Sequence, residues 1–229
     1  MDDGDVLTSA FKDQDAVISA ALEPITVENQ KTWIDAAISA GVKRIFPSEY
    51  STNLESPLAE GLPALTGKKL VLSAGGLGPN FRTKMARYHN GGHNLIGATR
   101  LSDVAEAIAK ILRNEKGLYA EAGNKPVYIH SAAITEKQMT KIAEKVIGLP
   151  FAVEYYDVEE IYQNAKFRLA MGDMSALMQF YYQMMYGKGY GGSESFQEMS
   201  WNDKVGLKTM TETELEDLVR NIVQKNGAK

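Results

Sequence analysis

The stretch from Asp15 to Phe46 constrains the fold most strongly, because it changes from strand-like to helix-like patterning and back. Asp15 to Ala21 is an apolar run of strand length, suited to a strand that is buried on both faces. Apolar residues then follow helical spacing from Val27 to Ser39, and Val42 to Phe46 is predicted to form a second short strand. This order predicts a βαβ unit with two parallel strands.

Polar residues follow the second of these strands directly. Gly41 is suited to end the helix, because glycine adopts a positive φ without a Cβ clash. Pro47 is expected to stop the strand, since proline has no N–H to donate to a neighbouring strand. Ser48, Glu49 and Tyr50 then stand at the carboxyl end of the strand. Ligands of open α/β sheets bind at this edge, so the sequence predicts a ligand site here.

Composition narrows the class of protein. The net charge is −4 and no basic block is present, so we expect no nucleic-acid partner. The chain has no cysteine, which excludes disulfides, thiolate metal sites and a cysteine nucleophile, and which fits a reducing compartment. No apolar run approaches the roughly 18 residues of a membrane span, and the acidic start MDDGDVLTSAF lacks a signal-peptide core. We therefore expect a cytoplasmic protein without a membrane partner.

The rest of the chain is predicted to mix helices with short strands. Phe81 to Thr99 is expected to form a hairpin with Asn90-Gly91 at its turn. Ser102 is expected to cap the next helix. Two later helices are predicted to begin with capping boxes, at Thr135 with Gln138 and at Thr211 with Glu214. Further strands are predicted at Val127–Ile129 and Ala152–Tyr155.

Several strings resemble the isoflavone reductase-like proteins of the NmrA-like group, which are atypical short-chain dehydrogenases that bind NADP(H). VKRIFPSEY, at 42–50, is similar to their VKRF-PSEFG segment. GDVLTSAFKDQDAVISA, at 4–20, resembles the family stretch that leads to a strand beside the cofactor. TRLSDVAEAIAKIL, at 99–112, resembles their T-LSD-(G/A)-A-A-IL helix. The resemblance covers most of the chain in order.

The resemblance implies an α/β fold, with an incomplete Rossmann-type parallel sheet and a smaller C-terminal α/β substrate lobe. It implies one NmrA-like domain over 1–229, with 1–80 and 100–130 as a partial dinucleotide-binding core and 131–229 as the substrate lobe. The family's glycine-rich pyrophosphate turn has no counterpart in this sequence, and a block of the family is missing after Leu72. We therefore expect impaired binding of the dinucleotide, whose main anchor is that turn.

The resemblance also implies site residues. GKKLVL, at 67–72, resembles the family's GKKAVRDYLE helix, whose first lysine is a general acid/base candidate and matches Lys68. A partly buried lysine with a lowered pKa can serve in proton transfer, whereas a solvated lysine at a helix start is the ordinary alternative. The same comparison places six residues beside the cofactor: Ser19, Ala20, Pro47, Ser48, Glu49 and Tyr50. For Ser19 and Ala20 the alternative is packing at a strand end, and for Glu49 it is a structural hydrogen bond.

The function implied is an NADP(H)-dependent oxidoreductase that transfers hydride to a small aromatic or enone-type metabolite. Lys68 favours this enzyme hypothesis. A second hypothesis is a non-enzymatic NmrA-like regulator that senses a dinucleotide and binds a protein partner. A third is an inactive remnant or a shortened gene product, which the two gaps in the resemblance favour.

Two short motifs are weaker signals. Gly187, Gly189 and Gly192 spell G-x-G-x-x-G, but they follow a helical pattern rather than a strand, so a loop after a helix is favoured over a dinucleotide turn. Tyr162 and Lys166 spell the Y-x-x-x-K of ordinary short-chain dehydrogenases. Because they lie in the predicted substrate lobe, far from the cofactor edge, a chance match is the favoured interpretation.

The histidines and methionines receive structural interpretations. His89 and His93 are expected to decorate the predicted hairpin turn, and no metal site is predicted, because no carboxylate cluster stands beside them in the sequence. Helical spacing favours ordinary core over a substrate wall for the methionines and aromatic residues of the C-terminal lobe. These residues are Met171, Met174, Met178, Phe180, Tyr181, Tyr182, Met184, Met185 and Tyr186.

Overall fold

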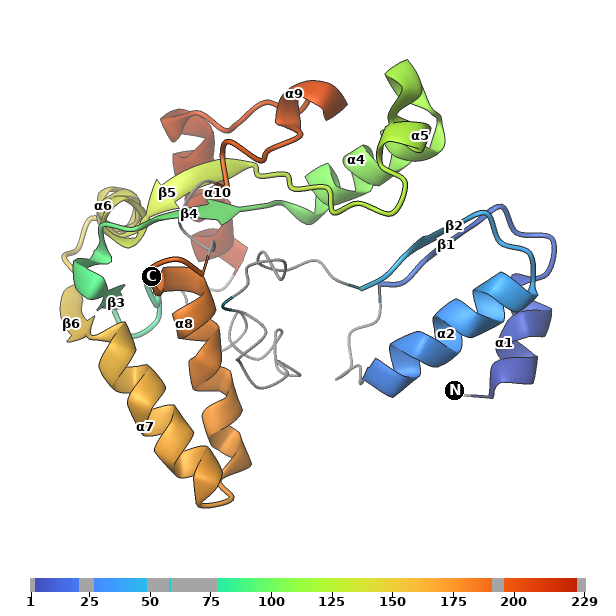
Figure 1. Cartoon of the computed structure of the whole chain (residues 1–229). Helices are drawn as coiled ribbons and strands as arrows, with labels where there is room; N and C mark the ends of the chain where they lie inside the picture. Colours follow the sequence, from blue (N-terminus) through green and yellow to red (C-terminus); the bar gives the residue numbers. More distant parts are fainter. Residues whose placement is uncertain (1–2, 21–26, 49–57, 59–77, 191–195, 226–229) are drawn as a thin grey trace.

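The computed structural model describes residues 3–20, 27–48, 58, 78–190 and 196–225 (Figure 1). The α-helices are α1 (Gly4–Phe11), α2 (Val27–Ser39), α4 (Leu101–Leu112), α5 (Leu118–Glu121), α6 (Glu136–Ile147), α7 (Val158–Ala170), α8 (Phe180–Tyr186), α9 (Asn202–Val205) and α10 (Glu212–Lys225). Short 3₁₀ turns are η2 (Asn90–Gly92), η3 (Glu115–Gly117) and η4 (Met174–Gln179). The strands are β1 (Ala16–Ile18), β2 (Arg44–Phe46), β3 (Met85–His89), β4 (Leu95–Ala98), β5 (Ala132–Thr135) and β6 (Ala152–Tyr156). The fold is α/β, as predicted.

The predicted βαβ unit is present at the N-terminal end of the chain. β1 and β2 pair in parallel, with Val17 opposite Ile45, and α2 connects them. α1 lies beside α2 (Figure 1). The expectation that β1 is buried on both faces is wrong: its residues are half-buried or exposed, and Ile18 is 48% exposed. Among the described strands β1 has β2 as its only neighbour, so little of its surface is covered.

The predicted hairpin over Phe81–Thr99 is wrong. β3 pairs in parallel with β6, and β4 pairs antiparallel with β5, so the two predicted arms never pair with each other. Asn90 and Gly91 do turn the chain, with φ of 49° and 83°. Gly92 continues the turn with φ of 72°, and a Cβ there would lie 2.7 Å from the Tyr88 ring. The turn therefore redirects the chain from one sheet to another, and long-range pairing decides the partners of each arm.

Some of the predicted helix caps and strands are confirmed and others are wrong. Both capping boxes are confirmed, at Thr135 with Gln138 and at Thr211 with Glu214. The strand at 152–155 is confirmed as β6, but the strand at 127–129 reduces to one bridge between Tyr128 and Ser200, while β5 follows it unpredicted. Ser102 lies inside α4 instead of capping it, because α4 begins at Leu101.

The main core lies in residues 78–225 and is divided into clusters. One cluster joins α4 and α5 to the segment around α9 and consists of Ala107, Ile111, Leu118, Ala122, Val205 and Leu207. A second consists of Ile96, Val158, Tyr181, Met185 and Tyr186. The core interpretation is thus confirmed for the residues of α8, whereas Met171 and Met174 are 74% and 63% exposed and the Met178 side chain lies outside the description. None of the described helices is long and apolar enough to cross a bilayer.

Candidate functional site

The end of α2 sets the direction in which β2 runs. Gly41 has φ of 76°, and its N–H donates to Ile38 O at 3.0 Å. The N–H of Val42 donates to Ala37 O at 3.0 Å, so two of the last helical carbonyls are satisfied by the residues after the helix. The predicted role of Gly41 at the helix end is confirmed. β2 then begins at Arg44, beside β1.

The ends of β1 and β2 lie side by side. The Ser19 N–H donates to Phe46 O at 2.8 Å, which continues the ladder one step beyond the strands. This bond places Ser19 and Ala20 next to Pro47 and Ser48. We call these four residues the carboxyl edge. Ala20 and Pro47 are exposed, and Ser19 and Ser48 are half-buried.

The carboxyl edge can bind and orient a ligand. The hydroxyls of Ser19 and Ser48 can donate and accept hydrogen bonds, and the exposed faces of Ala20 and Pro47 offer a small apolar surface. None of these four side chains titrates near neutral pH, so proton transfer would need another group. The predicted donor Lys68, and the predicted edge residues Glu49 and Tyr50, lie outside the described residues.

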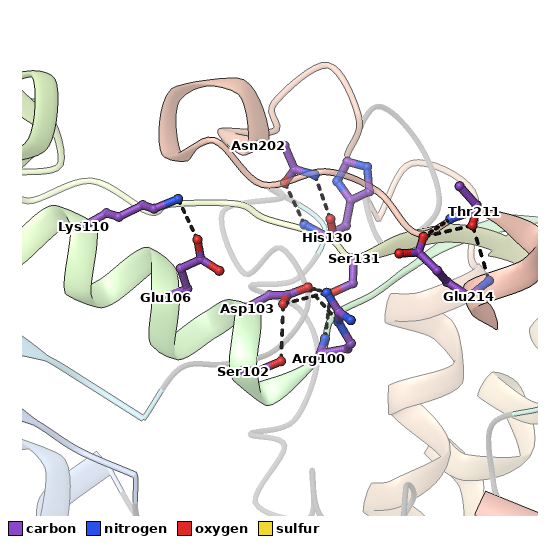
Figure 2. A network of polar contacts seen from close by, with 10 residues as sticks. All are labelled: Arg100, Ser102, Asp103, Glu106, Lys110, His130, Ser131, Asn202, Thr211 and Glu214. Carbon is purple, nitrogen blue, oxygen red and sulfur yellow. Dashed lines mark hydrogen bonds and ion pairs between the residues drawn. The ribbon is translucent and has the colours of Figure 1, made fainter. Parts of the chain in front are cut away.

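A second polar group surrounds the start of α4 (Figure 2). Asp103 is only 4% exposed, and its carboxylate accepts from Arg100 Nε and Nη2, each at 3.0 Å, and from Ser131 Oγ at 2.5 Å. Burial alone would raise the pKa of Asp103, but the hydrogen bonds from Ser131 and Arg100 together hold it below its usual range. The carboxylate is fully engaged in joining α4 to the chain before β5, which is a structural role. No motif in the sequence indicated this role for Asp103.

His130 and Ser200 form a neighbouring contact. His130 is 6% exposed, and burial lowers its pKa, so the neutral ring is favoured. Its Nδ1 lies 3.2 Å from Ser200 Oγ, while that same oxygen accepts the Asn202 N–H at 3.2 Å. The Asn202 side chain also bonds the His130 main chain through both its oxygen and its nitrogen (Figure 2). These bonds fasten the α9 segment to the chain before β5.

His89 is a core residue, so its predicted place in a hairpin turn is wrong. It is 1% exposed, and its ring stacks on Tyr182 and Tyr186 with centroids 4.5 and 4.6 Å apart. Glu136, also 1% exposed, accepts from His89 Nδ1 and from the His89 N–H, each at 2.7 Å. Burial beside this carboxylate raises the pKa of Tyr186 far above its ordinary value. His93 is exposed, with Nε2 2.7 Å from Lys137 Nζ.

The two weaker motifs stand where a structural role explains them. The Lys166 ammonium lies over the Tyr162 ring, 4.5 Å from its centroid, so it meets the ring face. Gly187 directly follows α8, and a Cβ there would lie 2.4 Å from Gln183 O. The described part of the glycine motif therefore follows a helix, as predicted, and Gly192 lies outside the described residues. Within the described chain no three His, Asp or Glu side chains converge as a metal site would require.

The chain is similar to known proteins both in an N-terminal segment and over most of its length. The model of the NmrA-like family matches residues 1–71. The oxidoreductase aprR of Aspergillus flavus is 25% identical over 228 residues, which cover 88% of this chain and 75% of that protein. The match to the family model contains the whole βαβ unit and the carboxyl edge.

Solved structures share the fold. An isoflavone reductase superposes with a TM-score of 0.66 at 19% identity, over 96% of this chain and 79% of that one. Leucoanthocyanidin reductase from Vitis vinifera, in complex with NADPH, gives 0.66 at 12% identity, over 97% and 80%. AtPrR2 with NADP+ and (+)pinoresinol gives 0.61 at 18% identity, over 96% and 79%. The resemblance predicted from sequence is confirmed: the chain carries an NmrA-like segment within the fold of the isoflavone reductase-like proteins.

Proposed function

We propose that this chain is an NADP(H)-dependent reductase that transfers hydride to a small aromatic or enone-type metabolite. The observation that carries the proposal is the carboxyl edge. Its four residues come from two parallel strand ends held together by the Ser19 N–H bond to Phe46 O, 2.8 Å long, inside the segment that matches the NmrA-like family. The related structures that contain NADPH or NADP+ support the same cofactor.

The residues present fit a nicotinamide nucleotide by their chemistry. Ser19 and Ser48 are half-buried and carry hydroxyls for the polar groups of the cofactor, while the exposed Ala20 and Pro47 leave room for its approach. Glu49 and Tyr50 extend this edge in the proposal. The cofactor would supply the hydride. Lys68 would supply a proton to the reduced substrate, as a general acid within hydrogen-bond reach.

Calorimetry with NADPH, and with NADH as the comparison, tests cofactor binding. We expect saturable binding that favours NADPH. Ala20→Leu should weaken it, because a larger side chain would stand on the exposed edge, whereas Ala170→Leu, at an exposed position on α7, should leave it unchanged. Millimolar NADPH would fill any site with a dissociation constant below about 1 mM. The absence of binding at that concentration would therefore overturn the proposal.

The Lys68→Ala variant tests the chemical step, with Lys69→Ala as the matched control. We expect Lys68→Ala to keep NADPH binding and to lose turnover of an enone by about 10² to 10⁴-fold, the usual contribution of a general acid. Lys69→Ala should keep both. If wild-type protein binds NADPH but reduces no aromatic or enone substrate, the dinucleotide-sensing regulator becomes the better hypothesis.

A further inference from the structure

Arg44 links the βαβ unit to the rest of the molecule. Its Nη1 donates to Ala122 O at 3.2 Å, and its Nη2 donates to Tyr119 O. The guanidinium also lies over the Tyr119 ring, 4.2 Å from the centroid. Tyr119 belongs to α5 and Ala122 directly follows it, so Arg44 satisfies carbonyls at the end of that helix. The Arg44 side chain thus contacts both the main chain at the end of α5 and the ring of Tyr119.

Phe46, on the same strand, makes a second contact between β2 and the rest of the molecule. Residues two apart in a strand share a face, so Arg44 and Phe46 lie on one side of β2. Phe46 packs against the cluster that contains Ala107, Ile111 and Leu118. β2 is therefore held against α4 and α5 by an apolar contact at its end and by a polar contact two residues before it.

We propose that Arg44 is a positioning residue for the carboxyl edge, which it fixes by holding β2 against the end of α5. The inference rests on the proposed function, since the edge is argued to receive the cofactor. Phe46 O, which accepts the Ser19 N–H at 2.8 Å, lies two residues after Arg44. A shift of β2 would therefore move Ser19 and Ala20 together with Pro47 and Ser48. Errors of this kind in site geometry are costly for binding and for turnover.

Arg44→Met removes the guanidinium and keeps most of the apolar stem. Arg44→Lys keeps the charge but replaces the planar fork by a single ammonium. Lys110→Met is the matched control, because Lys110 Nζ also donates to a carbonyl at the end of a short helix, Val205 O at 2.7 Å, but on α9. Hydrogen exchange reports the position of the edge without any ligand, and calorimetry reports NADPH affinity.

We expect Arg44→Met to speed amide exchange over 16–19 and 44–48 and to leave 85–89 and 152–156 unchanged. Its NADPH dissociation constant should rise by about tenfold or more, because the edge is no longer held in place. Arg44→Lys should fall between Arg44→Met and wild type in both measurements, and it serves as the test if Arg44→Met does not fold. Lys110→Met should resemble wild type in both.

The possible failures are distinguishable. If wild-type protein does not bind NADPH, the proposed function fails, and exchange in the Arg44 variants still decides whether Arg44 holds the edge. Unchanged exchange over 44–48 in Arg44→Met overturns the inference. Faster exchange with unchanged NADPH affinity overturns the positioning role as well, because the cofactor would then bind regardless of where β2 lies.

Discussion

The βαβ unit, taken together with α1 (residues 3–20 and 27–48), buries few apolar side chains, whereas the region from 78 to 225 buries many. Among the described residues of the unit, the buried apolar side chains are two alanines, Ala36 and Ala37. The larger region buries aromatic and branched residues, among them Phe180, Tyr186 and Ile111. Because burial of apolar area is the main source of stability, the unit draws little from its own core.

Close polar contacts between acidic and basic side chains repeat this contrast. Lys43 Nζ lies 2.7 Å from Asp15 Oδ1, and both side chains are largely exposed, at 71% and 84%. His89 Nδ1 lies 2.7 Å from Glu136 Oε1, and both side chains are 1% exposed. The carboxyl edge belongs to the thinly packed unit. We therefore propose that its geometry depends on the contacts of β2 with α4 and α5, and thin packing of this kind is common in ligand-binding elements.

Truncation of a core ring should give the largest effect. Phe180 is 1% exposed and packs against Ala165 and Ala176, so Phe180→Ala should lower the free energy of unfolding by about 3–5 kcal/mol. Phe167→Ala removes the same ring from a position that is 67% exposed on the neighbouring helix α7, and should cost far less. Urea unfolding measures both. Equal losses would mean that the described core does not carry the stability of the larger region.

The buried hydrogen-bonded pair of His89 and Glu136 should give the next effect. In Glu136→Gln the amide oxygen can still accept the main-chain N–H of His89, but the amide N–H₂ then faces Nδ1, so His89 must either change its tautomer or leave a buried donor without an acceptor. We expect a loss of about 1–3 kcal/mol, the cost of leaving a buried donor unsatisfied. Glu154→Gln, which removes a half-exposed partner 3.8 Å from Arg87, should change the free energy of unfolding by less than about 1 kcal/mol. A smaller loss for Glu136→Gln than for Glu154→Gln would contradict the contrast.

Local signals in the sequence predicted the local structure well. Gly41 ends α2, and Thr135 and Thr211 open their helices, because each of these features depends on residues within one turn of chain. The parallel pairing of β1 with β2 followed from a connection that is too long for a hairpin and contains a helix. The end of β2 was predicted as a ligand site from the same unit, whereas Ser19 and Ala20 were placed beside it by the family resemblance.

Long-range contacts decided the rest. Asn90-Gly91 is a strong hairpin signal, but its arms find partners in β6 and β5, far along the chain. His89 is hydrogen-bonded to Glu136, which stands 47 residues later, and no spacing rule joins the two. Arg44 meets Tyr119 O and Ala122 O 75 and 78 residues away, so its role was missed. The only available signal was a charged residue inside a short apolar strand.

The buried His130 should make the free energy of unfolding depend on pH. Burial lowers the pKa of His130 in the folded protein below the unfolded value of about 6.5. The unfolded chain then binds a proton more readily, so His130 contributes stability above about pH 6.5 that is lost as pH falls toward the folded pKa. We expect wild-type protein to lose more stability than His130→Gln between about pH 7.5 and about pH 5.5. Equal losses would mean that this histidine is solvated in the folded state.

The exposed pair on the βαβ unit should give the smallest effect. The hydrogen bond and the charge of Lys43 lower the pKa of Asp15, so its contribution would be lost as pH falls below the ordinary range of an aspartate. Solvent screens this pair, and both side chains give up conformational freedom to form it. Asp15→Asn should therefore leave the urea midpoint unchanged within error, although the pair that loses its charge has the same N–O distance, 2.7 Å, as the pair of His89 and Glu136. If Asp15→Asn lowered the free energy of unfolding as much as Glu136→Gln, the unit would depend on its surface pairs. Burial would then not predict which of the two contacts stabilises the protein more.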